Sequence, residues 1–247
     1  MAAEALMRSV RVVPYSVLGS QLTLERRIAR KVPPPDASTL FVDPAGLPFI
    51  TQLGPGAAAG ASGAIYEFLG IRDDDEFPEP VRAAIRDVCD AHWHTYAAPT
   101  GDDDGCAPRE LNCCHVVGPN FNAMFPPLPF PGEDGVVDDP QRAEHEAEGL
   151  AKLTLVYANV LREFARSKLP RLRLLPVSGG IFAGKLRDAM PALTFRALRA
   201  AADQLGDADA AAVAAAADGV EMCIFEEAHL TLFEEALERA RADDGAQ

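Results

Sequence analysis

Residues 38–43 read Ser-Thr-Leu-Phe-Val-Asp, and residues 54–63 read Gly-Pro-Gly-Ala-Ala-Ala-Gly-Ala-Ser-Gly. The first stretch is short, apolar and bounded by turn residues, which predicts a buried strand over 38–43. The second predicts a tight glycine-rich loop that leads into a helix over 64–70. The pattern occurs again at 172–184, where the apolar run 172–177 enters Ser178-Gly179-Gly180-Ile181-Phe182-Ala183-Gly184. A strand, a glycine-rich turn and a helix form the repeating unit of an open α/β sheet.

The rest of the chain continues this alternation. Hydrophobic periodicity and flanking turn residues predict strands at 10–17, 111–117 and 220–225, and helices at 24–31, 79–96, 142–168, 191–205 and 226–241. Pro14 places the first strand at a sheet edge, because proline cannot donate to a strand ladder. The alanine-rich residues 207–219 fit either a helix or a flexible connector. We therefore predict an α/β chain with a mostly parallel sheet covered by helices on both faces.

We expect one domain over 1–247, with its core at about 10–240. No internal repeat or linker divides the chain, and an irregular proline-rich insertion is expected at about 120–140, where Pro126 to Pro140 form the proline- and acid-rich part.

Charge and composition exclude several classes of partner. Asp and Glu outnumber Lys and Arg by 37 to 23, so the net charge of −14 opposes binding to a nucleic-acid polymer. The sequence lacks a run of 18 apolar residues and a signal-peptide pattern near Met1, so we expect no membrane contact and a cytoplasmic or nuclear location. Five widely spaced cysteines in a chain of this size favour reduced thiols over a disulfide framework.

The two glycine-rich loops are the strongest candidates for a binding site. Ligands of open α/β sheets bind beyond the carboxyl ends of the strands, where small residues let backbone N–H groups approach phosphate oxygens. Such a site can hold a diphosphate without lysine, which suits an acidic chain. Ordinary tight turns between strands and helices are the alternative reading. The spacing of Gly54, Gly56 and Gly60 is not that of a Rossmann loop, and a P-loop is absent from the sequence, so no dinucleotide cofactor is expected.

In order along the chain, four stretches resemble the macrodomain family. They are residues 41–46 (Phe-Val-Asp-Pro-Ala-Gly) with 60–66 (Gly-Ala-Ser-Gly-Ala-Ile-Tyr), residues 115–119 (His-Val-Val-Gly-Pro), residues 174–184 and residues 223–227 (Cys-Ile-Phe-Glu-Glu). The family commonly reads Ile-Val-Asn-Ala-Ala-Asn, then Gly-Val-Asp-Gly-Ala-Ile-His, Ile-His-x-Val-Gly-Pro and Pro-Ala-Ile-Ser-Thr-Gly-Ile-Tyr-Gly at these places. The resemblance implies a three-layer α/β/α sandwich with a mixed sheet.

The resemblance also implies a ligand, ADP-ribose, between the two loops. By position, the residues facing the diphosphate and the distal ribose are Gly60, Ala61, Ser62, Gly63, Ala64 and Ile65 on one side, and Ser178, Gly179, Gly180, Ile181 and Phe182 on the other. Phe225 stands where the family packs an aromatic ring on adenine. Gln21 replaces the family's aspartate at the adenine amino group, and its side-chain carbonyl accepts that hydrogen bond without the help of a charge.

Departures from the family pattern concern catalysis. Hydrolytic members use an asparagine and an aspartate near the distal ribose, and the matching residues here are Gly46 and Ser62, while Asp43 replaces the first asparagine. A serine is not a carboxylate base at neutral pH, so the usual hydrolase chemistry is in doubt. Asp43 and Ser62 are the candidate catalytic residues that remain, with a structural role for Asp43 as the alternative.

Two other clusters fit a structural role better than chemistry. On a strand, Cys113 and His115 lie about 6.5–7 Å apart and Cys114 points to the opposite face, so neither thiol reaches the imidazole. His92 and His94, placed on a helix, point about 200° apart and lack further ligands at a zinc-like spacing. We expect no metal site.

Three functions remain open on the sequence. The first is binding of ADP-ribose, free or attached to a protein. The second is hydrolysis of an ADP-ribosyl bond by a rearranged set of residues. The third is a macrodomain-like chain with an empty site that acts through its surface.

Overall fold

The computed structural model describes residues 2–98, 109–125 and 141–242. The polar stretch 99–108 and the proline-rich stretch 126–140 lie outside the described residues, so the irregular insertion stays a prediction. Residues 121–124, at its expected start, form a short helix.

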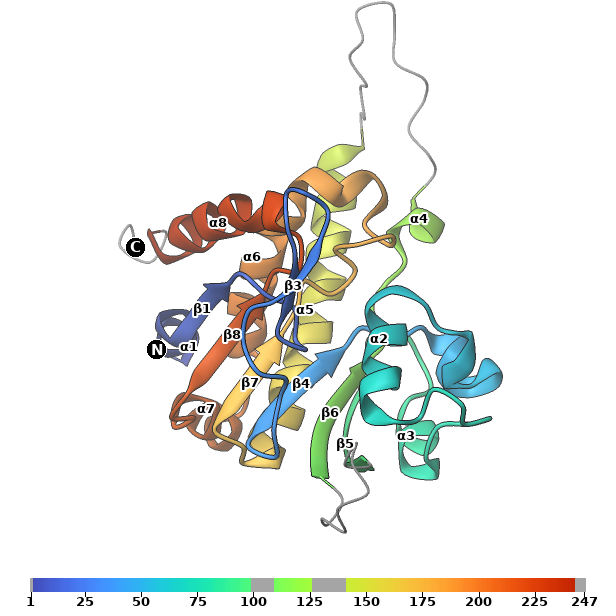
Figure 1. Ribbon diagram of the computed structural model, residues 1–247. Helices are drawn as coiled ribbons and strands as arrows, with labels where there is room; N and C mark the ends of the chain where they lie inside the picture. Colours follow the sequence, from blue (N-terminus) through green and yellow to red (C-terminus); the bar gives the residue numbers. More distant parts are fainter. Residues whose placement is uncertain (1, 99–108, 126–140, 243–247) are drawn as a thin grey trace, which may run out of the picture.

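One six-stranded sheet organises the described chain (Figure 1). Its strands follow the order β1 (Val10–Val13), β8 (Gly219–Cys223), β7 (Arg171–Leu174), β4 (Thr39–Asp43), β6 (Arg109–Val116) and β5 (Ala91–Ala98). All neighbours pair in parallel except β5, which runs antiparallel to β6. The predicted mixed, mostly parallel sheet is confirmed, and β1 lies at the edge that Pro14 indicated.

Helices cover both faces of this sheet. On one face lie α1 (Ala2–Ser9), α5 (Arg142–Ser167), α6 (Met190–Asp203), α7 (Asp207–Ala214) and α8 (Leu230–Ala242); on the other lie α2 (Gly60–Leu69) and α3 (Glu79–Ala84) (Figure 1). The three-layer arrangement predicted from the sequence is therefore confirmed.

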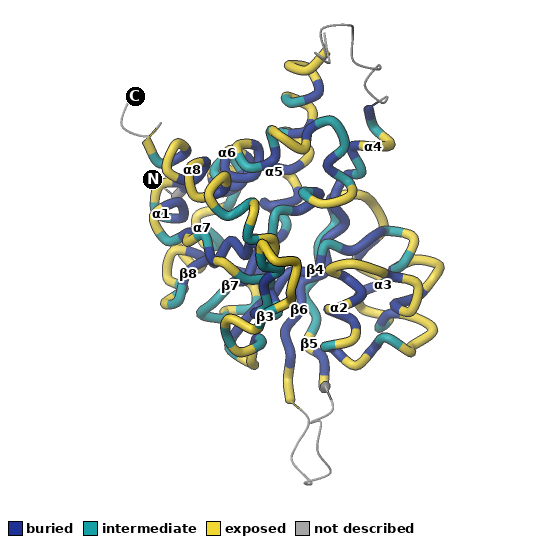
Figure 2. The backbone as a smooth tube through the Cα atoms, turned by 45° about the horizontal axis from the view of Figure 1, so that its top comes forward, coloured by how far each residue is buried: buried dark blue, intermediate teal, exposed yellow. Residues whose placement is uncertain are grey.

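The alternation of side chains along the strands produces two cores. In β4, which is buried throughout, Leu40 and Val42 pack with the α5 side, whereas Phe41 packs with the α2 side. Strands that are buried on both faces carry near-continuous apolar sequence, as residues 39–42 do. Figure 2 shows the buried strands at the centre of the molecule and exposed backbone around them.

The prediction of a helix over 24–31 is wrong. The segment belongs to a hairpin of β2 (Ser20–Leu22) and β3 (Ile28–Arg30), which turns where Thr23 N–H donates to the Arg27 carbonyl. Arg26 takes a positive φ of 60° in this turn. The mixture of charged and aliphatic residues in 24–31 suggested a helix, but Leu24 and Ile28 are exposed and bury no helix face.

The prediction of one helix over 79–96 is also wrong. Only α3 is helical, and the chain then turns, with Cys89 at a φ of 79° and the Arg86 and Asp87 amides bonded to an Asp90 carboxylate oxygen. The following residues pair with β6 as strand β5, so contact across the sheet overrides the apparent helical spacing.

Several boundaries differ by a few residues. Helix α2 begins at Gly60, so much of the first predicted loop forms its first turns, and α7 settles the 207–219 stretch as largely helical. The remaining short elements are η1 (Phe49–Leu53), η2 (Pro55–Ala57), α4 (Phe121–Met124), η3 (Gly184–Ala189) and η4 (Glu227–His229). Among the described helices, none has the length and apolar character needed to cross a bilayer.

Candidate functional site

The loops that carry the predicted site leave the sheet at one edge. Strands β4 and β7 are parallel neighbours, so the segments that follow Asp43 and Leu174 both start at their carboxyl ends. Strands β1, β6 and β8 run in the same direction and end at this edge as well. We call it the carboxyl edge, and it is where open α/β sheets bind ligands.

On the β4 side, the carboxyl edge presents the start of α2. Ala59, the residue at the N-cap, has extended backbone angles and supplies no side-chain hydrogen bond to the first turn. Gly60 and Ala61 are exposed, and a Cβ built on Gly60 would meet nothing within 4 Å. The first N–H groups of a helix carry a partial positive charge and have no partner within the helix, so they suit an anion.

Other residues predicted on this side have structural contacts. The Ser62 hydroxyl, 6% exposed, donates to the Pro44 carbonyl at 3.3 Å. Ile65 is buried in the core, and Ala64 is exposed one turn into α2. A Cβ on Gly46 would lie 2.8 Å from the Phe49 ring, which leaves no room there for a side chain without a shift.

The loop after β7 is held in a defined shape. Ser178 adopts a positive φ of 61°, and its hydroxyl donates to the Pro119 carbonyl at 2.7 Å. One residue earlier, the Val177 N–H donates to the Tyr157 hydroxyl of α5 at 3.0 Å. A positive φ in a residue other than glycine costs energy and persists where the surroundings fix it. This loop is therefore organised before any ligand arrives.

Beyond Ser178 the loop becomes open. A Cβ on Gly179 would lie 3.0 Å from Pro176, whereas one on Gly180 would meet nothing within 4 Å. Ile181 is 82% exposed and Phe182 is partly buried.

The segment after β6 supports this loop from the other side. The Phe121 N–H donates to the Phe182 carbonyl at 3.0 Å, and the Asn122 side-chain amide donates to the Ile181 carbonyl. A Cβ on Gly118 would come within 2.5 Å of the Ser178 hydroxyl, so the close approach requires glycine there. The sequence analysis placed 111–117 on a strand and 115–119 in the family pattern. It did not predict that Gly118 lies against Ser178.

Gln21 and Phe225, far apart in sequence, are brought together. The Leu22 N–H of β2 donates to the Phe225 carbonyl at 2.8 Å. Gln21 is 1% exposed, and its side chain makes no hydrogen bond to any residue that the structure describes. Phe225 is 38% exposed. A largely buried amide, one residue from the strand residue that bonds to a partly exposed aromatic residue, is an arrangement suited to a planar group that forms hydrogen bonds.

Asp43 lies beneath the edge in a buried polar network. One carboxylate oxygen, Oδ2, accepts from the Tyr66 hydroxyl of α2 and contacts His115 Nδ1, both at 2.7 Å. His115 Nε2 in turn contacts the Tyr96 hydroxyl at 2.7 Å. Burial and the Asp43 carboxylate raise the pKa of Tyr66, and burial raises that of Tyr96. Both phenols therefore stay protonated at neutral pH and tie β4, β5, β6 and α2 together.

The second oxygen of Asp43, Oδ1, is buried and has no hydrogen-bond partner among the described residues. Asp43 itself is fully buried, so it does not face the carboxyl edge as an exposed base would. Sequence reasoning singled out Asp43 but missed Tyr66 and Tyr96, which no spacing rule connects to it.

The cysteines and the remaining histidines do not form a rival site. Burial raises the pKa of the Cys113 and Cys114 thiols well above the ordinary value, and the His115 nitrogens contact Asp43 and Tyr96. His92 and His94 belong to strand β5, where the sequence placed them on a helix. Within 2–98, 109–125 and 141–242, no group of three metal-binding side chains comes together.

Comparison with solved structures identifies the architecture. A macrodomain from Trypanosoma brucei in complex with ADP-ribose is 14% identical, with a TM-score of 0.51, and the match covers 94% of this chain and 71% of that one. A mutant of the Oceanobacillus iheyensis macrodomain is 13% identical, with a TM-score of 0.53 and coverage of 95% and 93%. The chain has the macrodomain fold.

A third structure with this macrodomain fold is a poly(ADP-ribose) glycohydrolase from Deinococcus radiodurans in complex with ADP-ribose. It is 17% identical, with a TM-score of 0.54, and the match covers 97% of this chain and 90% of that one. No family model matches the sequence, and no curated protein matches it in sequence. The macrodomain resemblance predicted from the four stretches is thus shown at the level of the fold.

Proposed function

We propose that this macrodomain-fold chain binds ADP-ribose, or a related ADP-ribosyl ligand free or attached to a protein, at the carboxyl edge between α2 and the loop 178–184. The observation that carries the proposal is the start of α2. Its first N–H groups have no side-chain cap. Helix α2 follows β4 along the chain, and β4 pairs with β7, the strand that leads into Ser178, Gly179 and Gly180.

Backbone amides explain how an acidic protein would hold an anionic ligand. With a net charge of −14, the chain repels anionic polymers over long distances. Amide N–H groups and the dipole of α2 act only over a few ångströms, so they favour a compact diphosphate that fits against them. At the other end, the unpaired Gln21 amide and the Phe225 ring suit a nucleobase.

The structural relatives support the choice of ligand. The Trypanosoma macrodomain and the Deinococcus glycohydrolase were both solved in complex with ADP-ribose. The present chain shares their fold, and its sequence places small residues in the two loops.

Calorimetry with ADP-ribose tests this proposal. We expect a dissociation constant in the micromolar range or below, which corresponds to at least about 8 kcal/mol of binding free energy. AMP should bind much more weakly, because it lacks the second phosphate and the distal ribose. A protein that shows neither heat nor a thermal shift with millimolar ADP-ribose would refute the proposal and favour a macrodomain fold that acts through its surface.

Hydrolysis of an ADP-ribosyl bond is the second candidate, because one structural relative is named as a glycohydrolase. Here Ser62 is a nearly buried hydroxyl, and Asp43 is fully buried and bonded to Tyr66 and His115. Positioned general-base catalysis contributes about 10²–10⁴-fold, and we therefore expect slow or undetectable release of ADP-ribose by the unmodified protein.

Ser62→Asp tests the catalytic reading. It should raise turnover of an ADP-ribosylated protein more than it changes affinity for ADP-ribose, because a new base acts chiefly in the transition state. The companion Gly46→Asn is a poorer test, since its side chain would meet Phe49. Rapid hydrolysis by the unmodified protein that survives Ser62→Ala would establish a different route, and Asp43→Asn would then be the next variant.

A further inference from the structure

The connection 14–38 covers part of the sheet on the α2 side. Helices α2 and α3 contact β4 and β5 on this face, while Val17, Tyr15 and Leu18 of the connection pack with Val13 of the edge strand β1 and Cys223 of its neighbour β8. The β2–β3 hairpin is part of this connection, and Figure 1 shows it in front of the sheet, on the face opposite α5.

Arg173 of β7 is buried and lies under the connection. Its Nη1 donates to the Val17 carbonyl at 3.3 Å and to the Pro33 carbonyl at 3.2 Å. Val17 precedes β2 and Pro33 follows β3, so one guanidinium group contacts both ends of the hairpin unit. The planar guanidinium presents several donors in a fixed geometry, which suits such a double contact.

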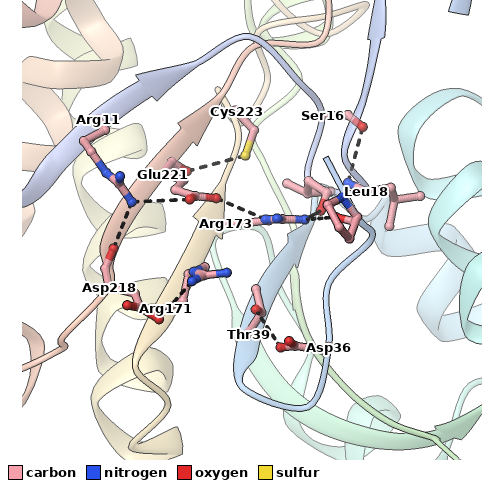
Figure 3. Close-up of polar contacts among 12 residues, drawn as sticks. Arg11, Ser16, Leu18, Asp36, Thr39, Arg171, Arg173, Asp218, Glu221 and Cys223 are labelled. Atoms are coloured by element: carbon pink, nitrogen blue, oxygen red, sulfur yellow. Dashed lines mark hydrogen bonds and ion pairs between the residues drawn. The ribbon is translucent and has the colours of Figure 1, made fainter. Parts of the chain in front are cut away.

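Glu221 of β8 holds Arg173 in place. Arg173 Nε donates to Glu221 Oε2 at 3.1 Å, and both side chains are buried (Figure 3). The other oxygen of Glu221 lies 3.4 Å from Arg11 Nη2 of β1. The Arg173 guanidinium also lies 5.4 Å from the centre of the Tyr15 ring. A buried arginine needs a counter-ion and filled donors, and this cluster provides them.

The position of the hairpin determines where Gln21 lies relative to Phe225. Gln21 is in β2, and the Leu22 N–H joins β2 to Phe225 at 2.8 Å. At the tip of the hairpin, the Leu24 N–H donates to a Glu227 carboxylate oxygen at 2.9 Å. The hairpin is thus fixed to the loop after β8 at one end and to Arg173 at the other.

We propose that Arg173 is a positioning residue for the base-binding end of the site: by holding the Val17 and Pro33 carbonyls, it sets the hairpin so that Gln21 stands beside Phe225. The inference rests on the proposed function, and it separates the two ends of the ligand. Loss of Arg173 affects recognition of a planar base and leaves the α2 end, which receives the diphosphate, unchanged.

The test uses the double variant Arg173→Met with Glu221→Gln. Removing Arg173 alone would leave the buried Glu221 carboxylate without its buried counter-ion and destabilise the fold, so both charges are removed together. Glu221→Gln alone serves as the reference for the double variant. Arg171→Met is the matched control, because Arg171 is two residues earlier in β7 and forms its ion pair with Asp218 at 3.0 Å, with no hydrogen bond to Val17 or Pro33 (Figure 3).

Two readouts distinguish positioning from general stability. Hydrogen exchange of the amides in 16–32, measured without ligand, should become faster in the double variant than in Glu221→Gln, while the amides of α2 and α5 keep their protection. The dissociation constant for ADP-ribose should rise by about tenfold, equivalent to about 1.4 kcal/mol. Binding of inorganic pyrophosphate should stay within about twofold, and Arg171→Met should match the unmodified protein in every measurement.

The results separate this proposal from the proposed function. If the unmodified protein fails to bind ADP-ribose, both the proposed function and the positioning role of Arg173 are refuted. If the unmodified protein binds but the double variant keeps the same affinity, or loses pyrophosphate binding equally, only the role of Arg173 is overturned. Unchanged exchange in 16–32 would overturn it as well.

Discussion

At the scale of single residues, Asp43 shows how much one buried carboxylate depends on its neighbours. A charge away from water is tolerated only when it is paired and bonded, and here Tyr66 and His115 both contact the same oxygen of Asp43. The network also connects helix α2 to strands β4 and β6 directly below the proposed ligand site. Breaking this hydrogen-bond network should therefore lower the stability of the fold.

Replacing Tyr66 by Phe should lower the free energy of unfolding by about 1–3 kcal/mol, because it removes a donor to a buried carboxylate oxygen. Denaturant titration followed by circular dichroism would measure the change. A Tyr66→Phe protein as stable as the unmodified one would contradict a structural role for the network.

Gly180 gives a second prediction, this time about the ligand. Because a Cβ at this position meets nothing within 4 Å, Gly180→Glu should leave the thermal midpoint within a few degrees. The acidic side chain should nevertheless abolish binding of ADP-ribose by occupying and repelling the phosphate position. Gly206→Glu, at another open glycine, is the control and should bind normally. Normal binding by Gly180→Glu would exclude the loop 178–184 as the phosphate site.

The candidate residues were partly accessible from sequence. Gly180 and Ser178 follow a predicted strand, and that order alone placed them at the carboxyl edge. The unusual φ of Ser178 and the space around Gly46 depend on residues 59 and 3 positions away, Pro119 and Phe49. Phe49 is close enough to Gly46 in sequence for a contact to be predicted, whereas Pro119 is too far from Ser178.

At the scale of elements, the first N–H groups of helix α2 can bind either an N-cap side chain or the proposed ligand, but not both. Ala59 stands at the N-cap and does not bond the first turn, so a serine there should accept one of the free N–H groups. Ala59→Ser should stabilise the protein by about 0.5–2 kcal/mol and weaken ADP-ribose binding about fivefold, since cap and ligand compete.

The control for this change is Gly206→Ser at the start of α7, which also lacks a side-chain cap. It should add a few tenths of a kcal/mol to stability and leave binding unchanged. Thermal denaturation and calorimetry on the two variants measure both quantities. Tighter binding by Ala59→Ser would show that the ligand does not use the first N–H groups of α2.

Elements were predictable where the apolar residues form one helical stripe or one short continuous run. The long stripe of α5 and the five buried residues of β4 have such patterns, and both were predicted from the sequence. Strand β5 was not predicted, because His92, Trp93 and Tyr96 are surrounded by β6 and by the helices packed on each side, all of which are distant in sequence or not evident from it. The β2–β3 hairpin failed for a related reason: its shape depends on Arg173 and Phe225, both more than 140 residues away.

At the scale of the whole molecule, all four tyrosines report on the integrity of the fold. Burial raises the pKa of Tyr15 and Tyr157 from about 10 to about 12, and raises those of Tyr66 and Tyr96 further. A raised pKa in the folded state means that the unfolded chain loses its phenolic protons first. The stability that these groups contribute is therefore complete below pH 10 and is lost as the pH rises above it.

We expect tyrosinate absorbance to stay low at pH 10 while the protein is native, and to appear together with loss of the circular dichroism signal at higher pH. In denaturant, all four tyrosines should ionise near pH 10. A native spectrum that coexists with ionised tyrosine at pH 10 would contradict the burial of these side chains.

The pairing of β1 with β8 has a consequence for how the molecule is made. Val10 pairs with Val220, 210 positions later, and Arg241 of α8 donates to the Val10 carbonyl at 2.7 Å. At translation rates of about 5–20 residues per second, β1 would emerge about 10–40 s before its partner. During that time its edge is open to chaperones or to other nascent chains. Strand β1 is thus made before the other strands of this sheet and is among the last of them to be paired.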